Sequence, residues 1–186
     1  MPDIPETKIL IMATHGFEQT ELITPLEKLR EAGASVHVAT PDGNAIKGWD
    51  EDDWGKSIDA DLKIADVSTD DYDALVLPGG QINPDLLRAD ETAVNLVRAF
   101  TEAGRIVAAV CHAPWLLVEA GVAKGREMTS YHSIKTDVIN AGANWVDKEV
   151  AIATGIITSR NPGDLEAFSA KIIAEVKEGR HPRKAA

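Results

Sequence analysis

Short apolar runs alternate with longer amphipathic stretches along this chain. The runs cover residues 8–13, 73–79 and 106–110 and are rich in Val, Ile, Leu and Ala. Continuous apolar runs of this length are typical of strands buried on both faces of a parallel sheet. Residues 35–40, which read SVHVAT, are expected to form the second strand along the chain.

The stretches between the runs have the spacing of helices. In residues 18–33, Leu22, Leu26 and Leu29 fall on one face and Gly33 supplies a stop. Similar patterns predict helices over residues 91–103, 135–141 and 164–178. The alternation predicts right-handed crossovers and an α/β layered fold. We expect the 186 residues to form one domain, 1–186, with a sizeable core.

Two segments and the tail have weaker patterns. Residues 44–72 hold an acidic tract between Trp49 and Trp54, which we interpret as solvated surface, and then an alternating stretch that predicts a short strand or hairpin at a sheet edge. Residues 149–159 predict one or two strands. The tail, residues 179–186, is expected to fray.

The only cysteine, Cys111, directly follows the third apolar run. Pro114 suits the first turn of a helix, so the thiol lies at a predicted strand-to-helix turn. Ala109 and Ala113 flank it, as a tight nucleophile elbow requires. A lone cysteine is most often a small buried hydrophobe. One that ends a core strand, just before His112 and a helix start, is better interpreted as a nucleophile.

Other strand ends carry glycines and polar residues. His15 and Glu18 follow the first strand, and Gly79 and Gly80 end the run 73–79. Because ligands of α/β sheets bind at the carboxyl ends of the strands, we expect these residues to converge on Cys111. The glycines let backbone N–H groups approach a ligand, which suits an oxyanion site. Glu18 could equally be a first-turn carboxylate that complements the helix dipole.

Net charge and composition restrict the classes of partner that the protein can be expected to bind. Lys and Arg number 19 against 30 Asp and Glu, and a net charge of −11 argues against nucleic acid or anionic membrane as a partner. A single cysteine excludes an internal disulfide, and no targeting or spanning segment is indicated, so we expect a cytoplasmic protein. Neither zinc-ligand spacing nor a phosphate-binding glycine loop occurs, so we expect no metal and no cofactor.

Four segments in combination resemble the DJ-1/PfpI family, in particular its PfpI-like branch: ALVLPGG, AAVCHAPWLL, TSYHSIKTDVINAGANWVD and ITSRNPGDL. The resemblance spans nearly the whole chain. It implies a flavodoxin-like three-layer α/β/α sandwich with a mainly parallel central sheet. It also implies Cys111 as the nucleophile, Glu18 touching the sulfur, and oxyanion donors from the backbone around Gly79, Gly80 and His112.

Further site residues follow from the same resemblance. His112 matches the base of the PfpI branch, and its carboxylate would be Asp85 of the partner subunit, so the protein would be a homo-oligomer, a dimer or a hexamer. Taken alone, Asp85 after a proline is a helix cap. Where relatives commonly read S-Y-P, this chain has Ser130-Tyr131-His132. We therefore expect Tyr131 and His132, with His15, at the rim of the site.

The expected carboxyl–thiol pair has an electrostatic consequence. A carboxylate and a thiolate persist side by side only if one of them holds a proton. We therefore expect Glu18 to be protonated with a raised pKa, and the pKa of Cys111 to be lowered.

The resemblance leaves three functions open. The first is a cysteine-dependent stress-response enzyme, a hydrolase or lyase of the glyoxalase or deglycase type, that acts on reactive carbonyls or their protein adducts. The second is an intracellular cysteine peptidase of the PfpI type acting on peptides. The third is a non-enzymatic redox-sensing or chaperone-like stress protein. We favour the first, because a small enclosed site suits a small electrophile better than an extended peptide.

Overall fold

The computed structural model describes residue 4 and residues 6–179. Its centre is a seven-stranded sheet in the order β10-β11-β7-β6-β1-β2-β5, in which only the β10–β11 pair is antiparallel. The strands of this sheet are β1 (Lys8–Met12), β2 (Ser35–Thr40), β5 (Leu62–Lys63), β6 (Ala74–Leu77), β7 (Ile106–Val110), β10 (Ala151–Ala153) and β11 (Ile156–Ser159).

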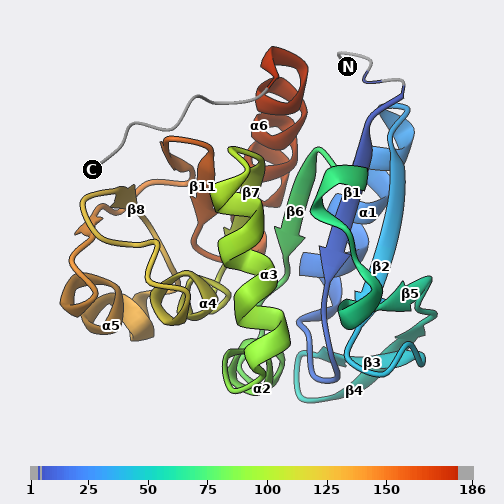
Figure 1. The fold of residues 1–186 in the computed structure, drawn as a ribbon. Helices are drawn as coiled ribbons and strands as arrows, with labels where there is room; N and C mark the ends of the chain where they lie inside the picture. Colours follow the sequence, from blue (N-terminus) through green and yellow to red (C-terminus); the bar gives the residue numbers. More distant parts are fainter. Residues whose placement is uncertain (1–3, 5, 180–186) are drawn as a thin grey trace.

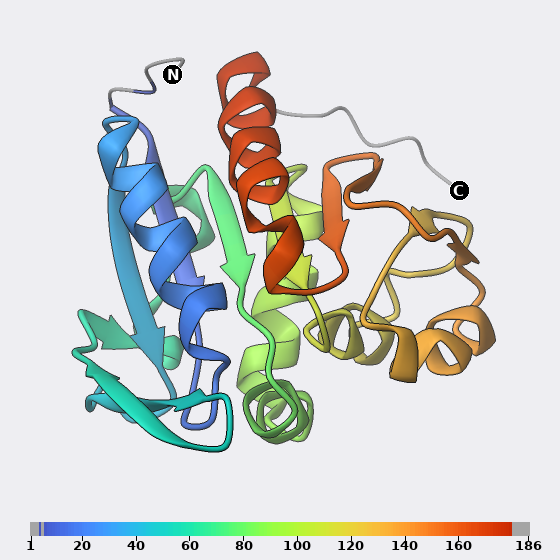
Figure 2. The ribbon, with the colours of Figure 1, turned by 180° about the vertical axis from the view of Figure 1, so that it is seen from behind.

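Helices cover both faces of this sheet. The α-helices are α1 (Gln19–Glu31), α2 (Ile82–Arg88), α3 (Glu91–Glu102), α4 (Pro114–Glu119), α5 (Lys135–Asn140) and α6 (Leu165–Glu178). Helix α3 crosses the near face in Figure 1, with α2 and α4 beside its lower end, and α1 and α6 cover the opposite face in Figure 2. The expected three-layer, flavodoxin-like α/β/α fold with a mainly parallel sheet is confirmed.

The alternation of side chains along β7 explains the two apolar cores. Val107 and Ala109 pack into the core under α3, whereas Ile106, Ala108 and Val110 pack into the core under α1 and α6. Successive side chains of a strand point to opposite faces, so a strand covered on both faces must be apolar at every position. This is why the run 106–110 has no polar residue.

The segment after β2 is more regular than its sequence pattern indicates. A separate antiparallel hairpin joins β3 (Ile46–Asp50) to β4 (Asp53–Ile58), and the rings of Trp49 and Trp54 pair across it at 5.5 Å. The acidic turn is exposed, as expected, but the flanking strands were not predicted. The predicted edge strand is β5, which pairs with β2.

The remaining elements are short. Strands β8 (Glu127–Met128) and β9 (Asn144–Trp145) form a two-stranded parallel sheet, and residues 149–159 form the two strands β10 and β11. The 3-10 helices are η1 (Ile64–Asp66), η2 (Thr69–Asp71), η3 (His132–Ile134) and η4 (Pro162–Asp164). Residues 180–186 of the expected frayed tail lie outside the described residues. None of the described helices combines the length and apolar character that crossing a membrane requires.

Candidate active site

Cys111 lies at the turn between β7 and α4, with Pro114 at the start of the helix. Its backbone φ of 62° is in the left-handed region, which non-glycine residues rarely adopt and which costs about 1–3 kcal/mol. Two hydrogen bonds hold the residue there: its N–H donates to Ser159 O at 3.0 Å, and its carbonyl accepts from Tyr131 N at 2.8 Å. Strain held in place in this way is characteristic of a nucleophile elbow.

The carboxyl group beside the thiol belongs to Glu21, and the expectation for Glu18 is wrong. Glu21 is fully buried and hydrogen-bonds to Cys111, and its Oε2 accepts from Gly79 N at 2.9 Å. Its Oε1 has no nitrogen or oxygen partner. The carboxylate of Glu18 instead caps α1, because Oε2 accepts from Glu21 N at 2.7 Å and from Thr20 Oγ1 at 2.6 Å.

A sequence signal for Glu21 was present. Glu21 precedes Pro25 by one helical repeat of four residues and Leu29 by two, and both of those residues are buried. Residues four apart share a helix face. A carboxyl group on the buried face of a helix that begins at the sheet's carboxyl edge is therefore directed into the protein, whereas Glu18 precedes the first turn.

Burial and mutual repulsion determine the pKa values of Glu21 and Cys111. Burial, followed by the charge of Glu18, raises the pKa of Glu21 from 4.5 to about 8. Burial, followed by the charge of Glu21, also raises the pKa of the Cys111 thiol, so the expected lowering is wrong. Because both pKa values lie above 7, Glu21 and the Cys111 thiol each hold a proton at neutral pH. The protonated carboxyl expected beside the sulfur is thus Glu21.

Two backbone N–H groups counteract the rise in the pKa of Cys111. Those of Gly80 and His112 hydrogen-bond to the sulfur of Cys111 and favour its negative form. They are placed to stabilise an oxygen anion that develops beside the sulfur. The N–H of Gly79, expected as a third donor, is occupied by Glu21. Gly79 serves packing, since a Cβ there would lie 2.7 Å from the Cβ of Cys111 and would contact Glu21 Oε2.

The imidazole of His112 reaches back to the sulfur. Its Nδ1 lies 3.1 Å from Cys111 Sγ, and its Nε2 lies 3.1 Å from Ser133 Oγ. The ring stacks on Tyr131 at 4.7 Å and meets Trp115 edge-on at 5.3 Å. Burial, followed by the charge of His132, lowers the pKa of His112 and favours the neutral ring, which can accept a proton. Ser133, which orients the ring, was missed by the sequence analysis.

Asp85 makes no contact with His112 within the chain. It is exposed on α2 and pairs with Arg88 at 3.2 Å between carboxylate and guanidinium. The guanidinium of Arg88 in turn lies 4.5 Å from the ring of Trp115. A role for Asp85 toward another subunit therefore stays a prediction.

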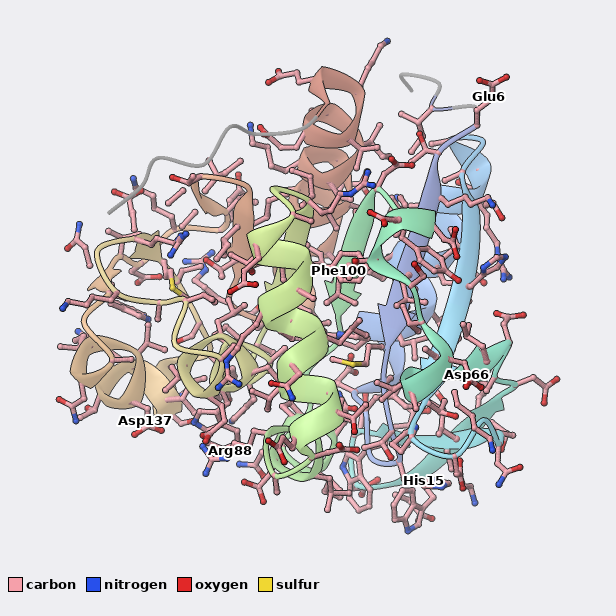
Figure 3. All side chains as sticks on the ribbon, in the orientation of Figure 1. Glu6, His15, Asp66, Arg88, Phe100 and Asp137 are labelled. Carbon is pink, nitrogen blue, oxygen red and sulfur yellow. The ribbon has the colours of Figure 1, made fainter. Side chains whose placement is uncertain are left out.

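The three expected rim residues differ in position. Tyr131 lines the cavity next to Cys111. His132 packs against the far side of Tyr131 at 4.4 Å between ring centroids, and lines a neighbouring pocket. His15 lies at the lower edge of the molecule in Figure 3. Its Nδ1 accepts from Lys47 N at 3.1 Å, and its ring is not part of the cavity lining. The expected place of His15 at the rim therefore stays a prediction.

The cavity in front of Cys111 measures about 460 Å³. Its lining adds residues that the sequence analysis did not single out, because they come from segments far apart in the chain. These residues are Gly16, Trp49, Glu51, Gln81, Ile82 and Pro162. A cavity of this size accommodates a small organic molecule or one side chain.

The described residues contain no group of three or more His, Cys, Asp or Glu side chains arranged to hold a metal ion. The groups at the cavity are a thiol, a carboxyl group, an imidazole and two backbone N–H donors, which are the groups that covalent and acid–base chemistry uses.

Fold and site together define a class of protein: an α/β sandwich with a cysteine at the strained turn after a central strand. The model of the DJ-1/PfpI family matches residues 7–175, and the chain belongs to this family. It is similar to a Pyrococcus furiosus protein named deglycase PfpI, with 41% identity over 91% of this chain and 99% of that protein.

Two further proteins show the range of the family. A Bacillus subtilis protein named as a candidate cysteine protease, YraA, is 42% identical over 87% of this chain and 94% of its own length. The crystal structure of Drosophila melanogaster DJ-1beta superposes with a TM-score of 0.83 and 34% identity, and covers 92% of this chain and 94% of that one. Similar proteins thus carry both deglycase and protease names.

Proposed function

We propose that this protein is a cysteine-dependent enzyme that acts on reactive carbonyl compounds or on their early adducts with proteins. The observation that carries the proposal is the convergence on Cys111 of a buried carboxyl group, Glu21, and two backbone N–H groups beside a cavity of about 460 Å³. A carbonyl carbon can approach the sulfur there while its oxygen faces the N–H groups of Gly80 and His112.

The proposed reaction begins when the Cys111 thiol gives its proton to Nδ1 of His112 and the sulfur adds to an aldehyde carbonyl. The S–C bond forms, the carbonyl π pair moves to oxygen, and Glu21 supplies the proton, which gives a hemithioacetal. For a 2-oxoaldehyde, the Glu21 carboxylate then carries a proton from the first carbon to the second, the hydroxyl proton on the first carbon passes to the oxygen of the second, and a thioester results. Water hydrolyses the thioester to a 2-hydroxy acid and the Cys111 thiol, and the proton held by His112 returns to Glu21. No oxidant or reductant is needed, because the carbonyl carbons exchange oxidation states.

A peptidase is the second candidate. It is favoured by the 3.1 Å separation of His112 Nδ1 and Cys111 Sγ and by the name of the Bacillus subtilis relative. The proposed triad would be completed by Asp85 of the partner subunit in a homo-oligomer, a dimer or a hexamer. A peptide would need to reach the sulfur through the same cavity, whose size favours a single side chain over an extended chain.

Assays of one protein preparation with three reagents distinguish these two candidates from each other and from the non-enzymatic alternative. The parent protein and Cys111→Ala are incubated separately with methylglyoxal, with a casein peptide and with dilute peroxide, and turnover and intact mass are followed. We expect loss of methylglyoxal with the parent protein only. Casein cleavage in its place would support the peptidase, and oxygen addition to the sulfur without any turnover would support a redox sensor. Turnover by Cys111→Ala would remove the covalent mechanism altogether.

A further inference from the structure

Carboxyl groups line the cavity, and none of the lysines or arginines among the described residues does. Its lining includes three carboxyl side chains, Glu18, Glu21 and Glu51, of which Glu18 and Glu51 lie toward the exterior. The only other titratable groups in the lining are Cys111, His112 and Tyr131. In a partly enclosed space such an arrangement attracts cations and repels anions, because low-dielectric walls concentrate the field.

The arginines nearest to the cavity are neutralised by carboxylates. Arg160, in the pocket on the other side of Tyr131, binds Asp147 at 2.7 Å and Asp164 at 2.9 Å. Arg88 pairs with Asp85 at the pocket that shares Gln81 and Ile82 with the cavity. Neither of these two arginines is therefore a free positive group for an anionic substrate.

The β3–β4 hairpin holds Glu51 in place. Three hydrogen bonds anchor this hairpin to the segment that leads into α1: Gly16 N to Lys47 O at 2.8 Å, Trp49 N to Phe17 O at 2.7 Å, and Lys56 N to Gln19 Oε1 at 2.6 Å. The turn itself is fixed by Trp49 Nε1, which donates to the carbonyl of Glu51 at 2.9 Å.

Glu51 is available to a ligand. Its φ of 55° places it in the left-handed region at the turn, and its carboxylate makes no hydrogen bond or ion pair with another described residue. The rings of Trp49 and Tyr131 line the same cavity, and aromatic faces attract cations. Deeper in the cavity, the buried Oε1 of Glu21 also lacks a nitrogen or oxygen partner.

We propose that Glu51, presented by the β3–β4 hairpin, makes this site selective for carbonyl groups carried close to a positive charge, as in an adduct on a lysine or arginine side chain, and selective against anionic carbonyl compounds. The substrate class rests on the proposed function. The charge selection is a property of the cavity and can be tested without any turnover.

The test uses three methanethiosulfonates of different charge. Each transfers its thioalkyl group to the Cys111 thiolate, so that a disulfide forms and methanesulfinate leaves. Because Cys111 is the only cysteine, intact mass reports on this site alone. The rates of labelling with the cationic trimethylammonioethyl reagent and the anionic sulfonatoethyl reagent are each divided by the rate with the neutral methyl reagent. Each ratio is then divided by the corresponding ratio for free 2-mercaptoethanol, which corrects for the intrinsic reactivity of the reagents. We expect the cationic reagent to be favoured, and the preference to shrink in 0.5 M salt.

Glu51→Gln and Asp52→Asn form a matched pair, because each removes one negative charge from the same turn and Asp52 does not line the cavity. We expect Glu51→Gln to lower the cation-to-anion rate ratio about two- to fivefold, the range of exposed charge pairs, and Asp52→Asn to leave it near the parent value. Equal corrected rates in the parent protein, or equal losses in the two variants, would overturn the inference.

A second measurement concerns the substrate class. Phenylglyoxal and 4-carboxyphenylglyoxal differ by one negative charge away from the reacting carbonyls. We expect a higher kcat/KM for phenylglyoxal, and a smaller preference in Glu51→Gln. An equal or reversed preference in the parent protein would overturn the selectivity against anions. If neither compound is turned over while the labelling ratios behave as expected, the carbonyl function fails and the charge selection stands.

Discussion

At the scale of single residues, the neighbouring glutamates Glu18 and Glu21 have different structural roles. Glu18 caps the first turn of α1 from outside the helix, while Glu21 is buried against Cys111. The cap satisfies a backbone N–H that the helix leaves unpaired, and the buried carboxyl group holds a proton next to the nucleophile. The two roles can be separated by their dependence on pH.

Glu21→Gln should remove a pH dependence of stability. The folded protein keeps a proton on Glu21 up to pH about 8, whereas the unfolded chain releases it near 4.5. The stabilising contribution is therefore fully present below pH 4.5 and is lost as the pH rises through about 8. Urea unfolding between pH 5 and 9 should show a falling midpoint in the parent protein and a flatter profile in Glu21→Gln. A parent profile as flat as that of the variant would contradict a raised pKa.

Glu18→Ala is the contrasting variant. Loss of the cap should cost about 1 kcal/mol of unfolding free energy at every pH, because the lost bonds go to the N–H of Glu21 and the hydroxyl of Thr20. The slope of stability against pH should become smaller but persist, because burial, the main cause of the raised pKa of Glu21, remains when the charge of Glu18 is removed. If Glu18→Ala removed the slope and Glu21→Gln did not, Glu18 would be the partner of the thiol after all.

At the scale of elements, the site depends on the close approach of the loop after β6 to the turn after β7. Gly79 permits this approach, because a Cβ would lie 2.7 Å from Val110 O as well as from the Cβ of Cys111. Val110 ends a strand buried on both faces and Cys111 directly follows it, so neither atom can move away at low cost.

Gly79→Ala should therefore abolish turnover and destabilise the protein by about 1–3 kcal/mol, the usual cost of overpacking. Gly121→Ala is the control, because nothing lies within 4 Å of its added Cβ and only its φ of 73° is unfavourable. The control should retain turnover. Measurement of turnover and urea midpoints for both variants checks the argument, and an active Gly79→Ala enzyme would show that the loop can retreat from the elbow.

At the scale of the whole molecule, the open question is whether one chain forms a complete site. The imidazole of His112 is already held by Ser133 and packed against two aromatic rings. Asp85 lies exposed on α2, paired only with Arg88 among its described neighbours. Because Nδ1 of His112 faces the sulfur of Cys111, Asp85 of a second chain would reach the ring at Nε2, where it would share or replace the contact with Ser133.

Complementation between subunits tests this arrangement. Asp85→Ala and His112→Ala proteins should each lose most of their activity and recover part of it when mixed and allowed to exchange subunits. Some interfaces would then pair an intact His112 with an intact Asp85 of the partner subunit. Exchange is verified by native mass spectrometry with isotope-labelled protein. Mixtures that exchange and stay inactive would leave Asp85 as a surface residue and limit the machinery to Glu21, Cys111 and His112.

The sequence by itself determined the layered fold and the place of Cys111 at the turn after a central strand. Both follow from local patterns: apolar runs such as residues 106–110 can only be buried strands, and Cys111 between a strand and Pro114 can only be at a turn. The same applies to α1, α3 and α6, whose apolar spacing is visible in the chain.

Only the tertiary structure decided which groups reach the sulfur. Glu18 and Glu21 differ by less than one helical turn, and the direction of α1 against the sheet, set by packing of Leu22 and Leu29, directs Glu21 to Cys111. Glu51 and Trp49 reach the cavity because the hairpin docks on the loop before α1. The raised pKa of Cys111 likewise follows from burial, which depends on everything that surrounds the elbow and not on its own sequence.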